Sequence, residues 1–469
     1  MNKRGLLVGL TAASVGVIYG YDLSSIAGAL LFITDDFGLS TQRQELVTTA
    51  VVIGQIVGAL GAGSLANTVG RKRSMVLILA GYAIFALLGA FSMSLPMLVV
   101  ARLLLGVTIG ISIVVVPVYV AESAPAAVRG SLLAAYQLAT VGGLILGYLS
   151  GYLLAGTHSW RWMLGLAAVP ATLLLPLLLR MPDTARWYTL KGRDDEARAA
   201  LQRVNPTASE AAIEAELAEI RGATGEEQGH SGGRLAEMLR PPYLRATLFV
   251  VALGFLIQIT GINAIIYYSP RLFEAMGSTG YFALLGLPAL VQVAGLAAVC
   301  AALVLVDRVG RRPILLCGIA MMIVADAILI AVFSTGADGI HGAGVIGGIV
   351  GVLLFIVGFD FGFGSMVWVY AGESFPAHLR AIGSSAMLTA NLSANAIIAA
   401  GFLTMLHSLG GAGTFGAFAV LSVISFAFIY RFAPETKGRQ LEDIRLFWEN
   451  GGRWPDAAPE RAPDRGMAP

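Results

Sequence analysis

Charged side chains are scarce in this sequence, and long stretches of it contain none. Only 13 % of the 469 residues are charged, while 57 % are hydrophobic. A soluble domain carries about 25 % charged residues. The 31 basic and 29 acidic residues are concentrated in residues 181–245 and 431–469. This composition excludes a soluble globular protein and predicts that the rest of the chain lies in a lipid bilayer.

Cysteine and clustered histidine are also nearly absent. The two cysteines, Cys300 and Cys317, lie in apolar runs and indicate no disulfide framework. The five histidines have no metal-binding spacing, and there is no glycine-rich loop of the kind that binds nucleotide phosphates. The net charge of +2 gives no argument for nucleic-acid binding. We therefore expect neither an enzyme nor a cofactor, a metal or a nucleic-acid partner.

What the sequence has instead is long apolar runs. Twelve of them reach the roughly 20 residues that cross a hydrocarbon core. They are 6–33, 46–66, 74–94, 97–121, 131–155, 161–180, 246–275, 282–306, 313–334, 343–372, 381–406 and 413–432. The first is too long for the apolar region of a cleaved signal peptide. These runs predict an all-α membrane protein with twelve transmembrane helices.

The basic residues between these helices favour one side of the membrane. Connections after even-numbered helices hold most of the Lys and Arg, whereas the odd-numbered connections have almost none. The positive-inside rule then places the even-numbered connections and both termini in the cytoplasm. We expect a multi-pass protein of the plasma (inner) membrane.

The same runs divide the chain into four parts. Residues 1–180 and 246–432 are expected to form two six-helix bundles. Residues 181–245, rich in Ala, Glu and Arg, are expected to form a helical cytoplasmic linker. Residues 433–469 form a cytoplasmic tail with a disordered, proline-rich end.

Three motifs occur twice, in the same order, at matched cytoplasmic helix ends. The pairs are 67–73 with 307–313, 122–129 with 373–380, and 182–184 with 434–436. Such repetition indicates two pseudo-symmetric six-helix halves of parallel topology. This organisation is typical of transporters, in which the substrate site lies between the halves near the middle of the membrane.

The charges in these motifs allow two interpretations. Basic loops orient any membrane protein. Their fixed spacing, however, suits a tight turn whose Arg forks onto a carboxylate of a neighbouring helix, which would latch the two halves together. The residues of this cytoplasmic gate are Arg71, Glu122, Arg129, Arg311, Glu373 and Arg380.

Together with further motifs, these residues resemble the sugar porter family of the major facilitator superfamily and are similar to bacterial xylose and glucose proton symporters. The resemblance covers residues 6–445. It rests on Gly20-Tyr21-Asp22, Gly70-Arg71-Lys72-Arg73, Arg102 to Gly106, Glu122 to Gly130, Pro182 to Trp187, Gln258 to Asn263, Tyr267-Tyr268, Gly310 to Pro313, Glu373 to Arg380, and Pro434 to Arg439. It implies the major facilitator fold, and alternating access coupled to protons.

Asp22 and Arg102 reach a similar depth, in the first and fourth helices. An unpaired charge at a helix centre costs about 2.5–3.5 kcal/mol on insertion scales, so each is the natural partner of the other. The pair is either a permanent structural link or, as the resemblance implies, a proton-coupling pair with a titratable carboxylate. Asp326 and Asp360 are two further intramembrane carboxylates and remain rival proton sites or buried hydrogen-bonded groups.

A sugar site needs amides, which both donate and accept, and an aromatic surface. Single amides in membrane helices more often bond neighbouring helices, but here several lie at matched depth around a helix break at Gly261. The resemblance places sugar contacts at five positions, and helix seven adds a tyrosine. The candidate substrate-binding residues are Gln137, Gln258, Asn263, Tyr267, Trp368 and Asn391.

Three departures from the family pattern stand out. Ile257 replaces one of two adjacent glutamines, Gly295 replaces an asparagine of helix eight, and Asn67 replaces a loop aspartate. With two polar contacts missing, the pocket is expected to suit a less hydroxylated, smaller or unusual polyol. Asn67 is expected to weaken the first cytoplasmic latch.

The sequence thus predicts a monomeric secondary transporter that imports a monosaccharide or polyol by proton symport. Three alternatives stay open: a uniporter, a symporter of a non-sugar organic solute, and a nutrient sensor that does not transport. The sensor usually has a long signalling tail, whereas the tail here is short.

Overall fold

The computed structural model describes residues 9–123, 129–206, 208–229, 234–335, 342–439 and 441–454, and these residues form helices and no β-strand. The first half contains α2 (Val15–Phe37), α3 (Thr41–Val69), α4 (Arg71–Ala90), α5 (Leu95–Ser123), α6 (Arg129–Leu154), η2 (Ala155–Thr157), α7 (Trp160–Gly165) and α8 (Ala168–Leu179). The linker contains α9 (Ala185–Leu190), α10 (Asp194–Val204), α11 (Glu210–Gly229) and α12 (Arg234–Met238). The second half contains α13 (Leu244–Ile259), α14 (Ile262–Ala275), η3 (Phe282–Gly286), α15 (Leu287–Val309), α16 (Arg311–Ser334), α17 (Ala343–Phe361), α18 (Phe363–Glu373) and α19 (Ala377–Phe432), and α20 (Leu441–Glu449) follows it.

The predicted all-α membrane fold is confirmed. Within the described residues, 11 helices are long and apolar enough to cross a membrane. The last, Leu379–Phe432, is 54 residues long. Gly410 interrupts it with φ 69° and ψ 173°, a conformation that glycine adopts without a steric penalty. Because this helix therefore crosses twice, the chain makes the twelve passages that the apolar runs predict.

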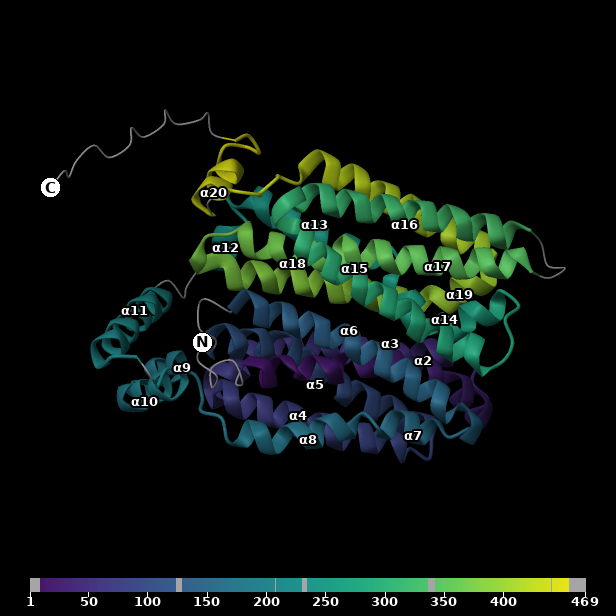
Figure 1. Ribbon diagram of the computed structural model, residues 1–469, viewed down its shortest axis with the longest axis horizontal. Helices are drawn as coiled ribbons and strands as arrows, with labels where there is room; N and C mark the ends of the chain where they lie inside the picture. Colours follow the sequence, from purple (N-terminus) through teal and green to yellow (C-terminus); the bar gives the residue numbers. More distant parts are fainter. Residues whose placement is uncertain are drawn as a thin grey trace.

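The two halves lie side by side along their whole length (Figure 1). The first half, purple to blue, forms the lower layer, and the second half, green to yellow, forms the upper one. The linker helices α9, α10 and α11 lie beside one end of the bundle, on the left. We call this the basic end, because the loops at Gly70–Lys72 and Gly310–Arg312 lie there. The opposite end is called the far end.

Glycine contacts hold the helices of the first half at close range. Each of Gly54 and Gly58 on α3, and Gly106 and Gly110 on α5, lies so near the opposite helix that an added Cβ would stand 2.1 Å from a carbonyl oxygen. An added Cβ on Gly20 of α2 would likewise stand 1.8 Å from the Thr140 carbonyl oxygen of α6. Small residues of this kind let membrane helices pack backbone against backbone. The packing fixes the positions of α2 and α5, which carry Asp22 and Arg102.

The internal repeat is visible in the backbone. Gly70 precedes α4 with φ 104° and ψ 156°, and Gly310 precedes α16 with φ 107° and ψ 163°. An L-residue with a side chain rarely adopts this conformation. The two basic loops are therefore one local structure used twice.

The seventh passage is broken where the sequence indicates a break. Gly261, with φ 99°, separates α13 from α14, and the Phe418 ring packs against it. The break places Gln258 at the end of one short helix and Asn263 at the start of the next.

Candidate functional site

Asp22 and Arg102 form a buried ion pair in the first half. Arg102 Nη1 donates to Asp22 Oδ1 at 2.5 Å, and the two residues are 2 % and 3 % exposed. The contact is the one expected from their matched depths. Asp22 Oδ2 and Arg102 Nε are also buried, and neither has a hydrogen-bond partner among the described residues. Geometry alone fits both a permanent link and a titratable switch.

At the basic end, the first half contains a dense cluster around Glu122. Arg71 donates from Nε and Nη2 to the two Glu122 oxygens at 3.1 and 3.3 Å, and Thr184 Oγ1 donates to Glu122 Oε2 at 2.6 Å. Asp183 Oδ1 accepts from the main-chain N–H groups of Arg71 and Lys72 at 3.0 and 3.2 Å. A carboxylate there satisfies the free N–H groups at the start of α4 and interacts favourably with the helix dipole.

The second half repeats this arrangement more loosely. Glu435 accepts from the main-chain N–H groups of Arg311 and Arg312, both at 3.1 Å, and so caps α16 as Asp183 caps α4. Arg311 Nε lies 3.9 Å from Glu373 Oε1, and its Nη1 lies 3.2 Å from Asp307 Oδ1. The pair of Arg311 with Glu373 is therefore longer and more exposed than the pair of Arg71 with Glu122.

Two of the pairs expected from the sequence, Arg71 with Glu122 and Arg311 with Glu373, are present, and in this structure each lies within one half. The expected latch between the halves stays a prediction. Arg71 bonds only residues of its own half, and so does Arg311. The reason is local: each basic loop and the carboxylates that it meets end neighbouring helices of one bundle. The Arg380 side chain has no hydrogen bond or ion pair with another described residue, and its Nε is buried without a partner. The side chain of Arg129 lies outside the described residues.

Polar contacts do join the halves, but at the far end. Glu45, near the start of α3 and 4 % exposed, accepts from the Thr404 main-chain N–H at 2.7 Å and from its Oγ1 at 2.8 Å. Tyr148 of α6 donates to the Ile266 carbonyl oxygen at 2.5 Å. These contacts, which the sequence did not reveal, close the far end. We call the contact of Glu45 with Thr404 the far-end clamp.

Several candidate sugar contacts lie together in the second half. Gln258 Nε2 donates to Asn391 Oδ1 at 3.4 Å, which joins α13 to α19. Tyr267 accepts from Asn395 Nδ2 at 3.2 Å. Asn263 is 5 % exposed, at the start of α14. Gln258 Oε1 and Asn395 Oδ1 are buried without a partner in the described structure, so both retain unused capacity to accept a hydrogen bond.

Two further candidates make no polar contact with this group in the described structure. Gln137 is half-buried on α6 of the first half. Trp368 on α18 is 42 % exposed, unlike the buried Asn263 and Asn391. The structure gives neither residue a polar contact with the amide group described above.

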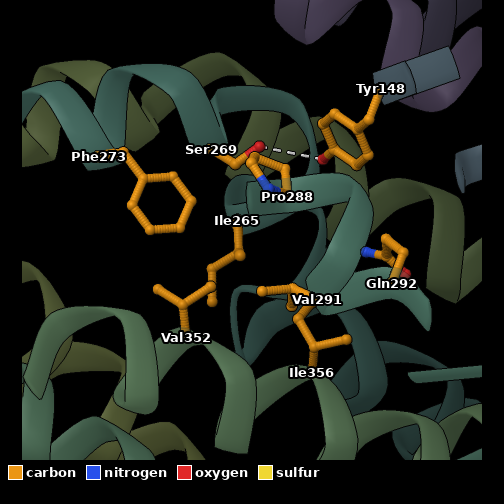
Figure 2. A pocket seen from close by; sticks show the side chains of 9 residues that line it. All are labelled: Tyr148, Ile265, Ser269, Phe273, Pro288, Val291, Gln292, Val352 and Ile356. Atoms are coloured by element: carbon orange, nitrogen blue, oxygen red, sulfur yellow. Dashed lines mark hydrogen bonds between the residues drawn. The ribbon is translucent and has the colours of Figure 1, made fainter. Parts of the chain in front are cut away.

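A small cavity lies where the halves meet near the far end (Figure 2). Its volume is about 10 Å³, which is room for about one water molecule. Ser269 Oγ donates to the Tyr148 hydroxyl at 3.1 Å on one side of it, and Gln292 lies on another (Figure 2). Gln292 Oε1 is buried and has no partner among the described residues.

Comparison with known proteins identifies the family. The profile described as "Sugar (and other) transporter" matches residues 8–448. The chain belongs to this family. It is therefore a multi-pass membrane protein of the sugar porters, a family of transporters and not of enzymes.

Curated relatives match nearly the whole chain. A galactose-proton symporter of Escherichia coli (strain K12) is 36 % identical over 434 residues, which are 92 % of each chain. An arabinose-proton symporter of the same strain is 35 % identical and matches 94 % of this chain and 93 % of its own. A glucose transporter of Staphylococcus epidermidis is also 35 % identical and matches 95 % of this chain and 97 % of its own.

Solved structures share the fold. The inward open conformation of the E. coli xylose transporter XylE matches 95 % of this chain and 100 % of that chain, with a TM-score of 0.80 and 25 % identity. The XylE proton:xylose symporter bound to 6-bromo-6-deoxy-D-glucose matches with a TM-score of 0.78 and 24 % identity, over 96 % of this chain and 100 % of that chain.

Proposed function

We propose that this sugar transporter imports a monosaccharide or polyol across the inner membrane by proton symport and alternating access. The observation that carries the proposal is the buried pair of Asp22 and Arg102, in which Asp22 Oδ2 and Arg102 Nε have no partner in the described structure. An ionisable group inside a membrane is costly and marks a functional site by default. The names of two relatives, a galactose-proton and an arabinose-proton symporter, agree with this substrate class.

The orientation follows from the basic loops, which place the basic end in the cytoplasm. The far end is then extracellular, and the far-end clamp holds it shut. At the basic end, the described hydrogen bonds of Arg71 and Arg311 stay within one half, so they leave the halves free to separate there. On this orientation the structure corresponds to an inward-facing state.

The charge of Asp22 provides the coupling. When ionised, Asp22 holds Arg102 by a charge-assisted hydrogen bond, and α2 is tied to α5. When protonated, it loses most of that attraction, and Arg102 is released. A carrier that reorients with sugar bound only when Asp22 is neutral, and that returns empty only when Asp22 is ionised and paired with Arg102, moves one proton inward with each sugar.

The sugar would contact both halves. Gln137 contributes from the first half, and Gln258, Asn263, Tyr267, Trp368 and Asn391 contribute from the second. Gln258 Oε1, which is buried without a partner in the described structure, would accept a hydrogen bond from a sugar hydroxyl. The amides lie on α13, α14 and α19, which meet at the break at Gly261. A movement of that break would therefore change the sugar site and, through Ile266 of α14, the contact with Tyr148 at the far end together.

Transport by purified protein in liposomes tests this function. We expect at least one of D-galactose, L-arabinose, D-glucose and D-xylose to accumulate above its external concentration when the outside is acidic, and a protonophore to abolish the accumulation. Uptake that only equilibrates, with or without the proton gradient, would establish a uniporter. Uptake of none of these sugars would favour a non-sugar solute or a sensor.

Cysteine labelling tests the orientation. Asp195 lies in the first turn of α10 and has a fully exposed side chain, so Asp195→Cys is open to reagents from the solvent on its side of the membrane. In a background without Cys300 and Cys317, an impermeant maleimide should label this cysteine only after the cells are opened. Labelling in intact cells would reverse the orientation and with it the assignment of the inward-facing state.

A further inference from the structure

Asp22 is closed off from water in this structure. The residue is 2 % exposed, and the described hydrogen bond of its carboxylate is to Arg102. Its second oxygen, Oδ2, is buried without a partner among the described residues. A symporter that faces the cytoplasm must nevertheless release its proton to that side. Protons move through a protein along groups that both accept and donate hydrogen bonds, so we expect such groups between Asp22 and the basic end.

Tyrosines lie on the basic-end side of Asp22. α2 ends where α3 begins, at the far end, so earlier residues of α2 lie nearer the basic end. Tyr19 is one turn before Asp22, on the same face of the helix and about 4.5 Å nearer the basic end. Tyr136 comes from α6 and Tyr82 from α4. Asp22 lies close enough to Tyr19 and Tyr82 to interact with each electrostatically, and Tyr136 lies equally within range of these two tyrosines.

Tyr136 extends this group toward the basic end, because α2 and α6 pack in parallel. A Cβ added to Gly16 of α2 would stand 2.6 Å from the Tyr136 carbonyl oxygen and 3.1 Å from its ring atom Cδ2. One turn further along, a Cβ added to Gly20 would meet the Thr140 carbonyl oxygen in the same way. Tyr136 is therefore level with Gly16, about 9 Å nearer the basic end than Asp22.

Two buried polar atoms without described partners lie on either side of Tyr19 along the bundle. They are Asp22 Oδ2 and the hydroxyl oxygen of Tyr136, while Tyr19 itself is half-buried. A buried polar group without a hydrogen bond is unfavourable, and buried water is the usual way to satisfy one. Tyr82 differs, because its hydroxyl is hydrogen-bonded to Ser112 Oγ at 3.3 Å. The free bonding capacity thus runs from Asp22 past Tyr19 to Tyr136.

We propose that Tyr19 and Tyr136, with bound water between them, conduct the proton from Asp22 to the cytoplasm. The protonated carboxyl gives its proton to the next oxygen of the chain while that oxygen passes its own proton on. A phenol suits this step because its oxygen can accept one hydrogen bond while its O–H donates another. Each tyrosine ends neutral, one proton leaves, and Asp22 is left ionised and paired with Arg102. The inference rests on the proposed function, in which Asp22 carries the coupled proton.

The relay acts on net transport and not on exchange. In counterflow the carrier reorients with sugar bound in both directions, and Asp22 stays protonated throughout, so no proton has to leave it. Net uptake, in contrast, requires the release of one proton for each sugar. Removing the relay should therefore slow net uptake and leave exchange unchanged. A residue that only supports packing or contacts the sugar would affect both rates.

The test uses Tyr136→Phe and the double variant with Tyr19→Phe, which remove hydroxyls and keep the rings. Tyr152→Phe is the matched control, since it lies on α6 nearer the far end than Asp22 and is also half-buried. Proteoliposomes are loaded with, or supplied with, whichever of D-galactose, L-arabinose, D-glucose and D-xylose the native chain accumulates. We expect the initial rate of proton-driven uptake to fall about tenfold or more in Tyr136→Phe and in the double variant. Counterflow by Tyr136→Phe, and both activities of Tyr152→Phe, should match those of the native chain.

Unchanged proton-driven uptake in the double variant would overturn the relay. So would an equal fall of counterflow and net uptake in Tyr136→Phe, which would make that tyrosine a sugar contact or a packing residue. Counterflow also shows that the variant is folded, and its Tm should not fall, because the hydroxyl of Tyr136 has no described partner to lose. If the native chain itself accumulates none of the four sugars from an acidic exterior, the proposed function fails and the relay with it.

Discussion

The two ends of the molecule are held together in different ways. At the far end, Glu45 and Tyr148 bond across the boundary between the halves. At the basic end, Arg71 and Arg311 bond within their own halves, although these loops are the most charged part of the bundle. Charge density and motif repetition therefore mark contacts within each half, whereas the described polar contacts that join the halves at the far end are buried and lie far apart in sequence.

The largest effect is expected from breaking the rigid contacts of the first half. Arg71→Ala leaves the half-buried Glu122 without its forked partner, with only the Thr184 hydroxyl still bonded to it. Losing one member of a largely buried pair costs about 3 kcal/mol. Arg311→Ala removes a longer, more exposed pair, which is worth less than about 1 kcal/mol. Thermal unfolding in detergent should show a clear fall in Tm for Arg71→Ala and a small one for Arg311→Ala. Equal falls would mean that the ion pairs of the two basic loops differ less in strength than their distances indicate.

A smaller effect is expected from opening the far-end clamp. Glu45→Ala removes the acceptor of two hydrogen bonds that join the halves, which should shift the equilibrium toward far-end opening by about 2 kcal/mol, or about 30-fold. Ala289 is buried against Ala27 and Tyr148 of the other half, so Ala289→Cys reports this opening through its labelling rate. Asp35→Ala, an exposed carboxylate at the same end, is the matched control. Equal labelling rates in the two variants would show that the clamp does not hold the far end shut.

The smallest effect concerns the amide group between the ends. Gln258→Ala removes a neutral hydrogen bond to Asn391 and an unused acceptor, so we expect sugar binding to weaken by about 1 kcal/mol, or about fivefold. Ser385→Ala, exposed on α19, serves as the control. Binding measured by calorimetry separates the two, and unchanged affinity in Gln258→Ala would place the sugar elsewhere.

The features that could be predicted from the sequence are those that depend on residues close together along the chain. The twelve crossings follow from apolar runs, and the repeated loops follow from motifs with the same internal spacing. The pairing of Asp22 with Arg102 followed from counting depth along two helices. In each case the rule needs only the position of a residue within its own helix.

The features that the sequence did not predict depend on how helices pack. The roles of Asp183 and Glu435 as helix caps were missed, although their repetition at matched positions was a usable signal. The far-end clamp joins residues 359 apart, and no spacing rule links them. A Cβ added to Gly295 of α15 would stand 2.2 Å from Asp360 Oδ2 of α17, and this closeness likewise depends on how the two helices pack.

The central claim is that the charge of Asp22 couples the proton to the sugar. Asp22→Asn should retain counterflow exchange in proteoliposomes, because its amide mimics the protonated side chain, and should lose accumulation driven by a proton gradient. Asp35→Asn, on the same helix and exposed, should retain both activities. Full proton-driven accumulation in Asp22→Asn would contradict the account and transfer the coupling role to Asp326 or Asp360.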